Sequence, residues 1–247
     1  MTAPLFLLEP GRLALAERGL PFVLDGQEGR HATTVKRLAP GEQVLLADGT
    51  GLLVAGEVAQ VRDGELTVRV GTIERVPAPE PRLVLVQALA KGDRDERAIE
   101  AATELGVDEV VPWQAGRSIV VWRGDRAAKA HRKWQGVVRA ASKQSRRALV
   151  PEVAPLADRP AVIRRLQGAA LGLVLHEDAT TPLAGVALPE AGEVVLVVGP
   201  EGGIGPEELD AFTEAGARTV RLGATVLRTS TAGPAALAVL SAAARWR

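Results

Sequence analysis

The sequence predicts an α/β protein in two parts, a small N-terminal β-barrel followed by a larger domain built on a mostly parallel sheet. Residues 1–73 consist mainly of short strand patterns joined by turns, which is typical of a small barrel. From residue 83 onward, strand and helix patterns alternate, as a parallel sheet requires. Three prolines at 77, 79 and 81 mark the linker. The predicted boundaries are therefore 1–73, 74–82 and 83–247.

Strand patterns separated by turn residues make up most of the N-terminal part. Short apolar runs at 5–8 and 21–24 predict two strands, and residues 42–51 predict a hairpin that turns at Asp48-Gly49. Two further runs, 52–61 and 65–73, continue the sheet. One helical segment, about 29–38, interrupts the strands and ends before Pro40-Gly41.

The C-terminal part alternates between the two kinds of element. Asp93 and Glu96 have the spacing of a capping box for a helix that ends at Gly106. The last helix is expected to begin near Thr231, with Pro234 in its first turn. Other predicted helices span 125–147, 158–167 and 207–215, and the predicted strands are 83–89, 107–113, 171–177, 194–199 and 218–223. The helix over 125–147 is expected to bury Ala130, Trp134, Val137 and Ala141.

Two segments, 194–205 and 220–231, each combine a β-branched run with glycine and the start of a helix. Gly199, Gly202, Gly203 and Gly205 lack a Cβ, so another backbone or a ligand can approach this segment closely. Spacing alone is compatible with an ordinary strand–turn–helix joint or with a ligand site. Two such joints in one α/β domain favour a ligand crevice at the strand ends.

Several chemistries are excluded or disfavoured by what the sequence lacks. There is no cysteine, and His31, His131 and His176 are scattered singly, so we expect no disulfide and no metal site. The nucleotide, hydrolase and zinc-protease motifs G-x-G-x-x-G, G-x-x-x-x-G-K-[ST], G-x-S-x-G and H-E-x-x-H do not fit. No apolar run is long enough for a membrane span, and the N-terminus does not resemble a signal peptide, so a cytoplasmic protein is expected.

Charge is balanced overall but divided unevenly along the chain. Residues 117–147 contain ten Lys and Arg against Asp125 alone, a net charge of +9. Residues 177–216 contain nine acidic residues and no basic one, a net charge of −9. A basic helix face is often merely solvated, but this excess favours contact with a polyanion such as RNA.

Motifs along nearly the whole chain resemble the ribosomal RNA small-subunit methyltransferase E (RsmE) family of the SPOUT methyltransferases. The N-terminal signature is carried by His31, Val35, Arg37 and Gly41. Lys91-Gly-Asp, the A-T-E-L-G-V segment at 102–107, and the basic pieces at 117–118, 133–134 and 144–147 match further family motifs. The most specific matches are V-G-P-E-G-G at 198–203 and L-G-x-x-V-L-R-T at 222–229.

The resemblance implies a PUA-like N-terminal barrel, a C-terminal SPOUT domain with a deep trefoil knot, and a homodimer. It implies methylation of N3 of one uridine of 16S ribosomal RNA in the assembled small subunit, with S-adenosylmethionine as the methyl donor. The residues that it places at the cofactor are Leu175, His176, Gly199, Pro200, Glu201, Gly202, Leu222, Gly223, Val226, Leu227 and Arg228.

Some of these residues have competing interpretations. Glu201 suits a cap, an ion pair or a ligand contact, and Val226 is as suitable for the core as for a cofactor. Removal of the imide proton from uridine N3 leaves an anion, which Arg228 is placed to stabilise as a catalytic residue. An ion pair of Arg228 with Glu201 or with a carboxylate at a helix end is the alternative.

The family commonly has an acid where Ser230 stands, and Ser230 is instead suited to cap the last helix.

The same resemblance and the charge pattern suggest where RNA binds. His31 also suits a cap or a packing role. The expected RNA contacts are His31, Arg37, Lys91, Arg117, Arg139, Lys143, Arg146 and Arg147.

Two other functions stay open. The fold could serve a non-catalytic RNA-binding or ribosome-assembly factor, an interpretation that only Ser230 favours. A related SPOUT enzyme could methylate the ribose 2′-O, but such enzymes commonly use an asparagine and this chain has none.

Overall fold

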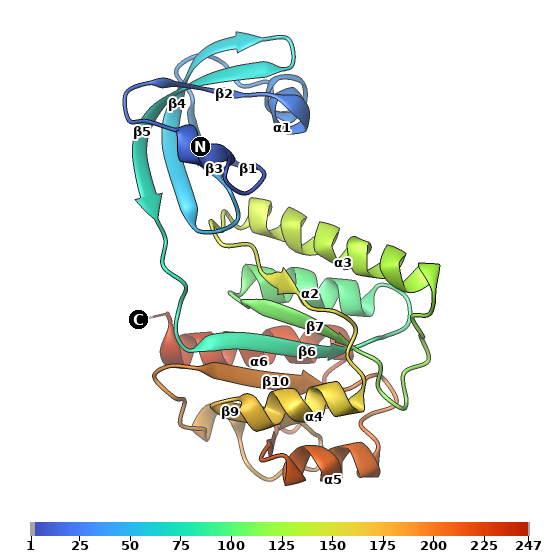
Figure 1. Ribbon diagram of the computed structural model, residues 1–247. Helices are drawn as coiled ribbons and strands as arrows, with labels where there is room; N and C mark the ends of the chain where they lie inside the picture. The colour runs from blue at the N-terminus through green and yellow to red at the C-terminus, as the bar shows by residue number, and fades with distance from the viewer. Residues whose placement is uncertain (1–2, 247) are drawn as a thin grey trace. The chain divides into compact units, whose positions relative to one another are not determined.

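The computed structural model describes residues 3–246, which form two compact units (Figure 1). The first unit extends to Ala78 and also contains Ser142–Val150. The second unit consists of Pro79–Ala141 and the chain from Pro151 onward.

A five-stranded sheet forms the first unit. The strands are β1 (Leu5–Leu7), β2 (Pro21–Leu24), β3 (Gln43–Ala47), β4 (Leu52–Arg62) and β5 (Glu65–Arg75), in the order β1-β3-β4-β5-β2. Neighbouring strands are antiparallel except β1 and β3. Apolar side chains such as Phe6, Leu46 and Leu66 fill its core. Within residues 3–246 no ladder joins the edge strands β1 and β2, so hydrogen bonds do not close the predicted barrel.

Three short helical segments accompany this sheet: η1 (Arg12–Leu15), α1 (Gly26–Arg30) and η2 (His31–Val35). The helix expected at 29–38 therefore begins earlier and ends earlier. It ends in a π-turn, and Arg37 beyond it has a left-handed φ of 52°. The hairpin turn at Asp48 is confirmed, because its carboxylate accepts hydrogen bonds from the amides of Thr50 and Leu52.

The segment Ser142–Val150 joins the first unit through backbone contacts that no local pattern predicts. The Gly51 amide donates to the carbonyl of Ala148 at 3.1 Å, and the Val150 amide donates to that of Gly49 at 3.0 Å. Ala148 is buried with Leu5, Leu7 and Ala47.

The second unit contains a six-stranded, wholly parallel sheet. Its order is β11-β9-β10-β6-β7-β8. The strands are β6 (Arg82–Ala88), β7 (Glu109–Trp113), β8 (Glu152–Val153), β9 (Leu171–Leu175), β10 (Glu193–Val198) and β11 (Arg218–Val220). The predicted mostly parallel sheet is confirmed.

Helices cover both faces of this sheet (Figure 1). Those of the unit are α2 (Arg94–Glu104), α3 (Asp125–Gln144, whose last three residues belong to the first unit), α4 (Arg159–Gly168), η3 (Leu183–Gly185), α5 (Pro206–Glu214) and α6 (Thr229–Ala244). Helices α4 and α5 pack together on one face, over Val84, Val86 and Val195. Helices α2 and α6 pack together on the opposite face.

Four expectations about these helices are wrong in detail. In α3, Val138 is buried and Ala130 and Val137 are only half-buried, because the buried stripe of Trp134, Val138, Ala141 and Ser142 is rotated from the predicted one toward Val138. The helix ends at Gln144, three residues early. Asp93 makes no capping bond and instead pairs with Arg97 at 2.8 Å. Helix α6 begins at Thr229, so Ser230 lies inside its first turn and Pro234 in its second.

Candidate functional site

The loops that follow the strands of a parallel sheet meet at its carboxyl edge, and the two glycine-containing segments lie there. Residues 199–205 connect β10 to α5, and residues 221–228 connect β11 to α6. These two strands flank β9, which ends at Leu175 and is followed by His176. The sheet order therefore brings the three predicted cofactor segments to one edge.

Close packing explains the first glycine of the loop. A Cβ at Gly199 would lie 2.7 Å from Cγ1 of Ile204, so a larger residue would displace the buried Ile204. The Gly199 carbonyl accepts a hydrogen bond from Thr229 Oγ1 at 2.9 Å, which joins the loop to the start of α6. The amide of Gly203 closes a turn onto the carbonyl of Pro200.

Glu201 holds the loop to the segment after β6. Its Oε1 accepts hydrogen bonds from Arg94 Nη1 at 2.5 Å and from the Lys91 amide at 3.0 Å. Partial burial acts to raise the pKa of Glu201, but its own backbone amide, Arg94 and the Lys91 amide outweigh it and lower that pKa. Glu201 is thus an ion-pair partner, although of Arg94 rather than Arg228.

Arg117 and Glu208 hold the same loop from the other side. Arg117 Nη1 donates to the carbonyl of Gly202 at 3.1 Å. Glu208, at the start of α5, accepts from the Gly205 amide at 3.2 Å and from the Gly116 amide at 2.8 Å. The glycine loop is therefore held by contacts with the segment after β6, the segment after β7 and the start of α6. Gly202 and Gly203 stay exposed.

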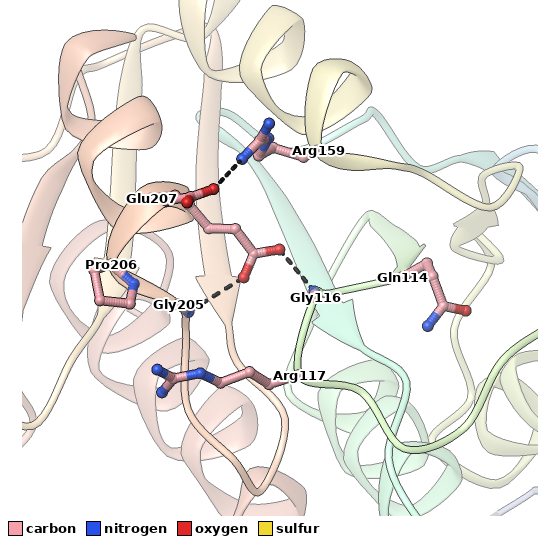
Figure 2. A pocket seen from close by; sticks show the side chains of 8 residues that line it. Gln114, Gly116, Arg117, Arg159, Gly205, Pro206 and Glu207 are labelled. Atoms are coloured by element: carbon pink, nitrogen blue, oxygen red, sulfur yellow. Dashed lines mark hydrogen bonds and ion pairs between the residues drawn. The ribbon is translucent and has the colours of Figure 1, made fainter.

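A cavity of about 420 Å³ lies beside this anchor (Figure 2). Arg117 and Arg159 point toward it, and Arg159 pairs with Glu207 at 3.5 Å. The positive charges of the two arginines are balanced by the negative charges of Glu207 and the buried Glu208. Because Glu208 already occupies the amides of Gly116 and Gly205, the start of α5 does not offer them to an anion. The lining residues are Gln114, Gly116, Arg117, Arg159, Gly205, Pro206, Glu207 and Glu208.

The second segment, 221–228, exposes most of its side chains. Its entry is held by hydrogen bonds of Arg221 with Thr181 and Leu183. Leu222 and Leu227 are half-buried and Gly223 is exposed. The core alternative for Val226 is wrong, because its side chain is 77% exposed.

Arg228 precedes α6 and is exposed. Among residues 3–246 it forms no ion pair, so the carboxylate partner weighed for it is not observed. His176 Nδ1 accepts from the Asp178 amide at 3.2 Å, which assigns the proton to Nε2 if the ring is neutral.

The predicted RNA contacts divide between the two units. In the second unit, Lys91 and Arg117 adjoin the glycine loop, and Arg139 is half-buried in α3. The others lie in the first unit. The ring of His31 packs edge-on against Phe6, with 6.1 Å between ring centroids, and Lys143 pairs with Glu28 at 2.8 Å. Arg37 and Arg146 are exposed and have left-handed backbone conformations, and Arg147 is half-buried. The packing role considered for His31 is thus observed, and Lys143 is neutralised.

Sequence reasoning missed four residues of the site: Gln87, Arg94, Glu208 and Thr229. Two of them have a local signal: Gln87 is the one polar residue in the apolar run at 83–90, and Thr229 ends the motif L-G-x-x-V-L-R-T. Within residues 3–246 no helix is long and apolar enough to cross a membrane. The same part of the chain contains no cluster of three or more acidic or histidine side chains placed to hold a metal ion.

Comparison with known proteins connects this geometry to a family. A family model described as "RNA methyltransferase domain" matches residues 77–241, and one described as "RNA methyltransferase PUA domain" matches residues 24–71. The first unit is accordingly PUA-like. The ribosomal RNA small subunit methyltransferase E of Mycobacterium bovis is 47% identical over 252 residues, which cover 100% of this chain and 94% of that protein.

Two solved structures are also similar to the whole chain. One is a ribosomal RNA small subunit methyltransferase E from Neisseria gonorrhoeae bound to S-adenosyl methionine, with a TM-score of 0.84, 28% identity and coverage of 98% of each chain. The other is a putative methyltransferase from Legionella pneumophila in complex with bound SAM, with the same TM-score and identity and coverage of 99% of each chain. The chain belongs to the ribosomal RNA small subunit methyltransferase E family.

Proposed function

We propose that this protein transfers a methyl group from S-adenosylmethionine to N3 of one uridine of 16S ribosomal RNA in the assembled small subunit. The observation that carries the proposal is the anchored glycine loop beside segment 221–228, in a chain whose relative of the same fold was solved with S-adenosyl methionine. The reaction belongs to the cytoplasm, where ribosomes are assembled in bacteria.

The residues at this edge suit an adenosine-type ligand. The exposed residues 201–203 and most of segment 221–228 offer backbone groups to an adenine edge, and the half-buried Leu175, Leu222 and Leu227 offer apolar contact. Bound there, S-adenosylmethionine supplies an electrophilic methyl group. The predicted contacts, Leu175, His176, Gly199 to Gly202, Leu222, Gly223 and Val226 to Arg228, all lie in these segments.

Arg228 is the residue that we assign to the chemistry. Methylation at N3 requires that the imide proton leaves and that the resulting negative charge on the base is stabilised. Arg228 is cationic, exposed and without an ion pair among the described residues, so its charge is available to the substrate. The proton passes to solvent, because no described side chain at this edge is placed as an evident general base.

We also propose a knotted chain and a homodimer. Helix α6 follows the edge strand β11, yet packs against β6, β10 and η3 of the β9–β10 connection. A trefoil knot requires the end of the chain to pass through one of its own loops, and contacts of α6 with both the sheet and the β9–β10 connection support such a passage. Val226 in segment 221–228, and Ile119 and Val121 in the segment after β7, are exposed apolar side chains that a second copy could cover.

The test is methyl transfer from labelled S-adenosylmethionine to small ribosomal subunits that lack the modification, followed by mapping of the methyl position. A methyl group on uridine N3 supports the proposal, and one on a ribose 2′-O supports the related SPOUT activity. Cofactor binding without transfer would identify a non-catalytic RNA-binding or assembly factor. Arg228→Ala should bind the cofactor and lose transfer; normal transfer would remove its catalytic role.

Ser230 provides a second test within the same assay. Because Ser230 lies in the first turn of α6, an acid there would sit near the positive end of the helix dipole. Ser230→Glu restores the residue common in the family. We expect the wild type and Ser230→Glu to transfer the methyl group equally, which would show that the serine does not mark a loss of catalysis. Transfer by Ser230→Glu alone would show that it does.

A further inference from the structure

Gln87 is an anomaly in the centre of the parallel sheet. It lies in β6 between buried apolar residues, and its side chain is 0% exposed. Alternation along the strand places Gln87 and Leu85 on the face covered by α6. A Cβ on Gly233 of α6 would lie 3.2 Å from Leu85 and 3.3 Å from Gln87 Oε1. A buried amide is costly unless hydrogen bonds replace those to water, so its partners are informative.

Gln87 Nε2 donates to the carbonyl of the adjacent Ala88 at 3.3 Å, and its other hydrogen bond begins a chain that ends at the glycine loop. Gln87 Nε2 donates to Thr229 Oγ1 at 2.9 Å, and Thr229 Oγ1 donates to the carbonyl of Gly199 at 2.9 Å. The hydroxyl has a single proton, which goes to Gly199, so it must accept from Gln87. The flipped amide would bring two acceptors together, and the direction of the chain is therefore defined.

Burial of the Gln87 amide costs free energy, because one of its polar atoms is left without a partner among the described residues. Gln87 Oε1 is buried and has no hydrogen-bond partner within residues 3–246. A leucine at this position would fill a similar volume without an unpaired oxygen, and Thr229 Oγ1 would keep its hydrogen bond to the Gly199 carbonyl, so stability does not require the amide. The presence of glutamine at this position is therefore better explained by the segments that its hydrogen bonds connect than by a contribution to the stability of the fold.

What it holds is the spacing between the two segments assigned to the cofactor. Gly199 is the first residue after β10, and Thr229 directly follows Arg228 after β11. We propose that Gln87 and Thr229 are positioning residues, which hold the glycine loop and Arg228 in register for S-adenosylmethionine. This rests on the proposed function, because it assumes that the cofactor lies between these segments.

The experiment measures S-adenosylmethionine affinity by calorimetry, without RNA, together with the melting temperature of each variant. Gln87→Leu should weaken binding about tenfold, the free energy of about one hydrogen bond, because Thr229 is no longer held against the glycine loop. The melting temperature should stay equal or rise, because the unpaired Oε1 is removed. Thr229→Val should weaken binding similarly. Thr229→Ser keeps the hydroxyl and should bind like the wild type.

Ser241→Ala is the matched control on the same helix. It removes a fully buried hydroxyl that donates to the carbonyl of Leu105 at 3.1 Å, far along α6 from Thr229. It should lower the melting temperature and leave the affinity unchanged. The double variant Gln87→Leu/Thr229→Val should lose about tenfold rather than a hundredfold, because both changes break one chain of bonds.

The outcomes separate the two proposals. Wild-type affinity in Gln87→Leu, or affinity losses that simply follow the melting temperature across all variants, would overturn the positioning role alone. A wild-type protein that does not bind S-adenosylmethionine would overturn the proposed function, and the positioning role with it.

Discussion

Glu208 of α5 and Gly116 of the segment after β7 are joined by a hydrogen bond of 2.8 Å from the Gly116 amide to the buried carboxylate. The second carboxylate oxygen of Glu208 accepts from the amide of Gly205 at 3.2 Å. One side chain therefore links two loops that are almost a hundred residues apart in sequence.

Replacement of Glu208 by alanine should destabilise the second unit and weaken the glycine loop. Two backbone amides lose a charged acceptor, so we expect a loss of about 2–3 kcal/mol in the free energy of unfolding. Urea unfolding measures this loss, and calorimetry measures the accompanying fall in S-adenosylmethionine affinity. Glu208→Gln, which keeps one acceptor oxygen, should lie between the wild type and alanine.

The neighbouring Glu207 is the matched control. Its side chain is 92% exposed and pairs with Arg159 at 3.5 Å. Glu207→Gln should change stability by less than about 0.5 kcal/mol. Equal effects at 207 and 208 would contradict the anchoring role of Glu208.

Glu201 should make stability depend on pH in the acidic range. Its pKa in the folded protein is lowered below the ordinary value of 4.5, so the stabilisation is present above that value and is lost as the pH falls through the lowered pKa. Glu201→Gln should therefore be less stable than the wild type at neutral pH, and the difference should shrink in acid. Urea titrations at about pH 7 and about pH 3 compare the two proteins. A difference that does not change with pH would argue against the ion pair with Arg94.

Arg165 should matter for stability and not for the cofactor. It forms a bidentate pair with the buried Glu109 at 2.5 and 2.6 Å, at the amino ends of the strands and opposite the glycine loop. Burial acts to lower the pKa of Arg165, but Glu109 and Glu193 outweigh it and raise that pKa. Arg165→Ala leaves the charge of Glu109 buried with only Arg82 beside it among these two arginines. It should lower the free energy of unfolding by about 3 kcal/mol.

The adjacent Arg164 is exposed and provides the control. Arg164→Ala should leave the unfolding midpoint nearly unchanged. Both variants should bind S-adenosylmethionine like the wild type, in a calorimetric titration below the unfolding transition. A weaker affinity in Arg165→Ala would show that the two edges of the sheet are coupled.

The exposed basic residues of α3 should bind RNA phosphates. Lys133 pairs with Glu96 and Lys143 with Glu28, so those two cations are partly neutralised. Arg126, Lys129 and Arg132 are exposed. Their joint replacement by glutamate should weaken binding to ribosomal subunits and make it less dependent on salt, because fewer counterions are released.

Filter binding over a range of salt concentrations measures both effects, with S-adenosylmethionine affinity as the check on folding. A double replacement of Arg164 and Arg218 by glutamate changes charge elsewhere on the second unit. It should leave the salt dependence close to that of the wild type. The same salt dependence in the α3 variant and the wild type would show that this helix face is merely solvated.

Local patterns in the sequence were sufficient for the order and type of most elements. The strands β2, β6 and β10 and the helix α4 depend on residue periodicity and turn chemistry within a few positions. Asp158, the predicted first residue of that helix, is its N-cap. The glycine loop and segment 221–228 were identified in the same way, and family resemblance assigned them to a cofactor. The boundaries 1–73, 74–82 and 83–247 stay a prediction.

Tertiary structure decided how these pieces act together. The pairing of Glu201 with Arg94, the anchoring of two loops by Glu208, the bonds from Gln87 through Thr229 to Gly199, and the inclusion of Ser142–Val150 in the first unit join residues far apart in the chain. The residues next to a side chain in sequence do not determine which distant group that side chain will bind through a hydrogen bond. That choice is made only when the strands are in register and the helices have packed on them, because hydrogen bonds require partners within about 3 Å.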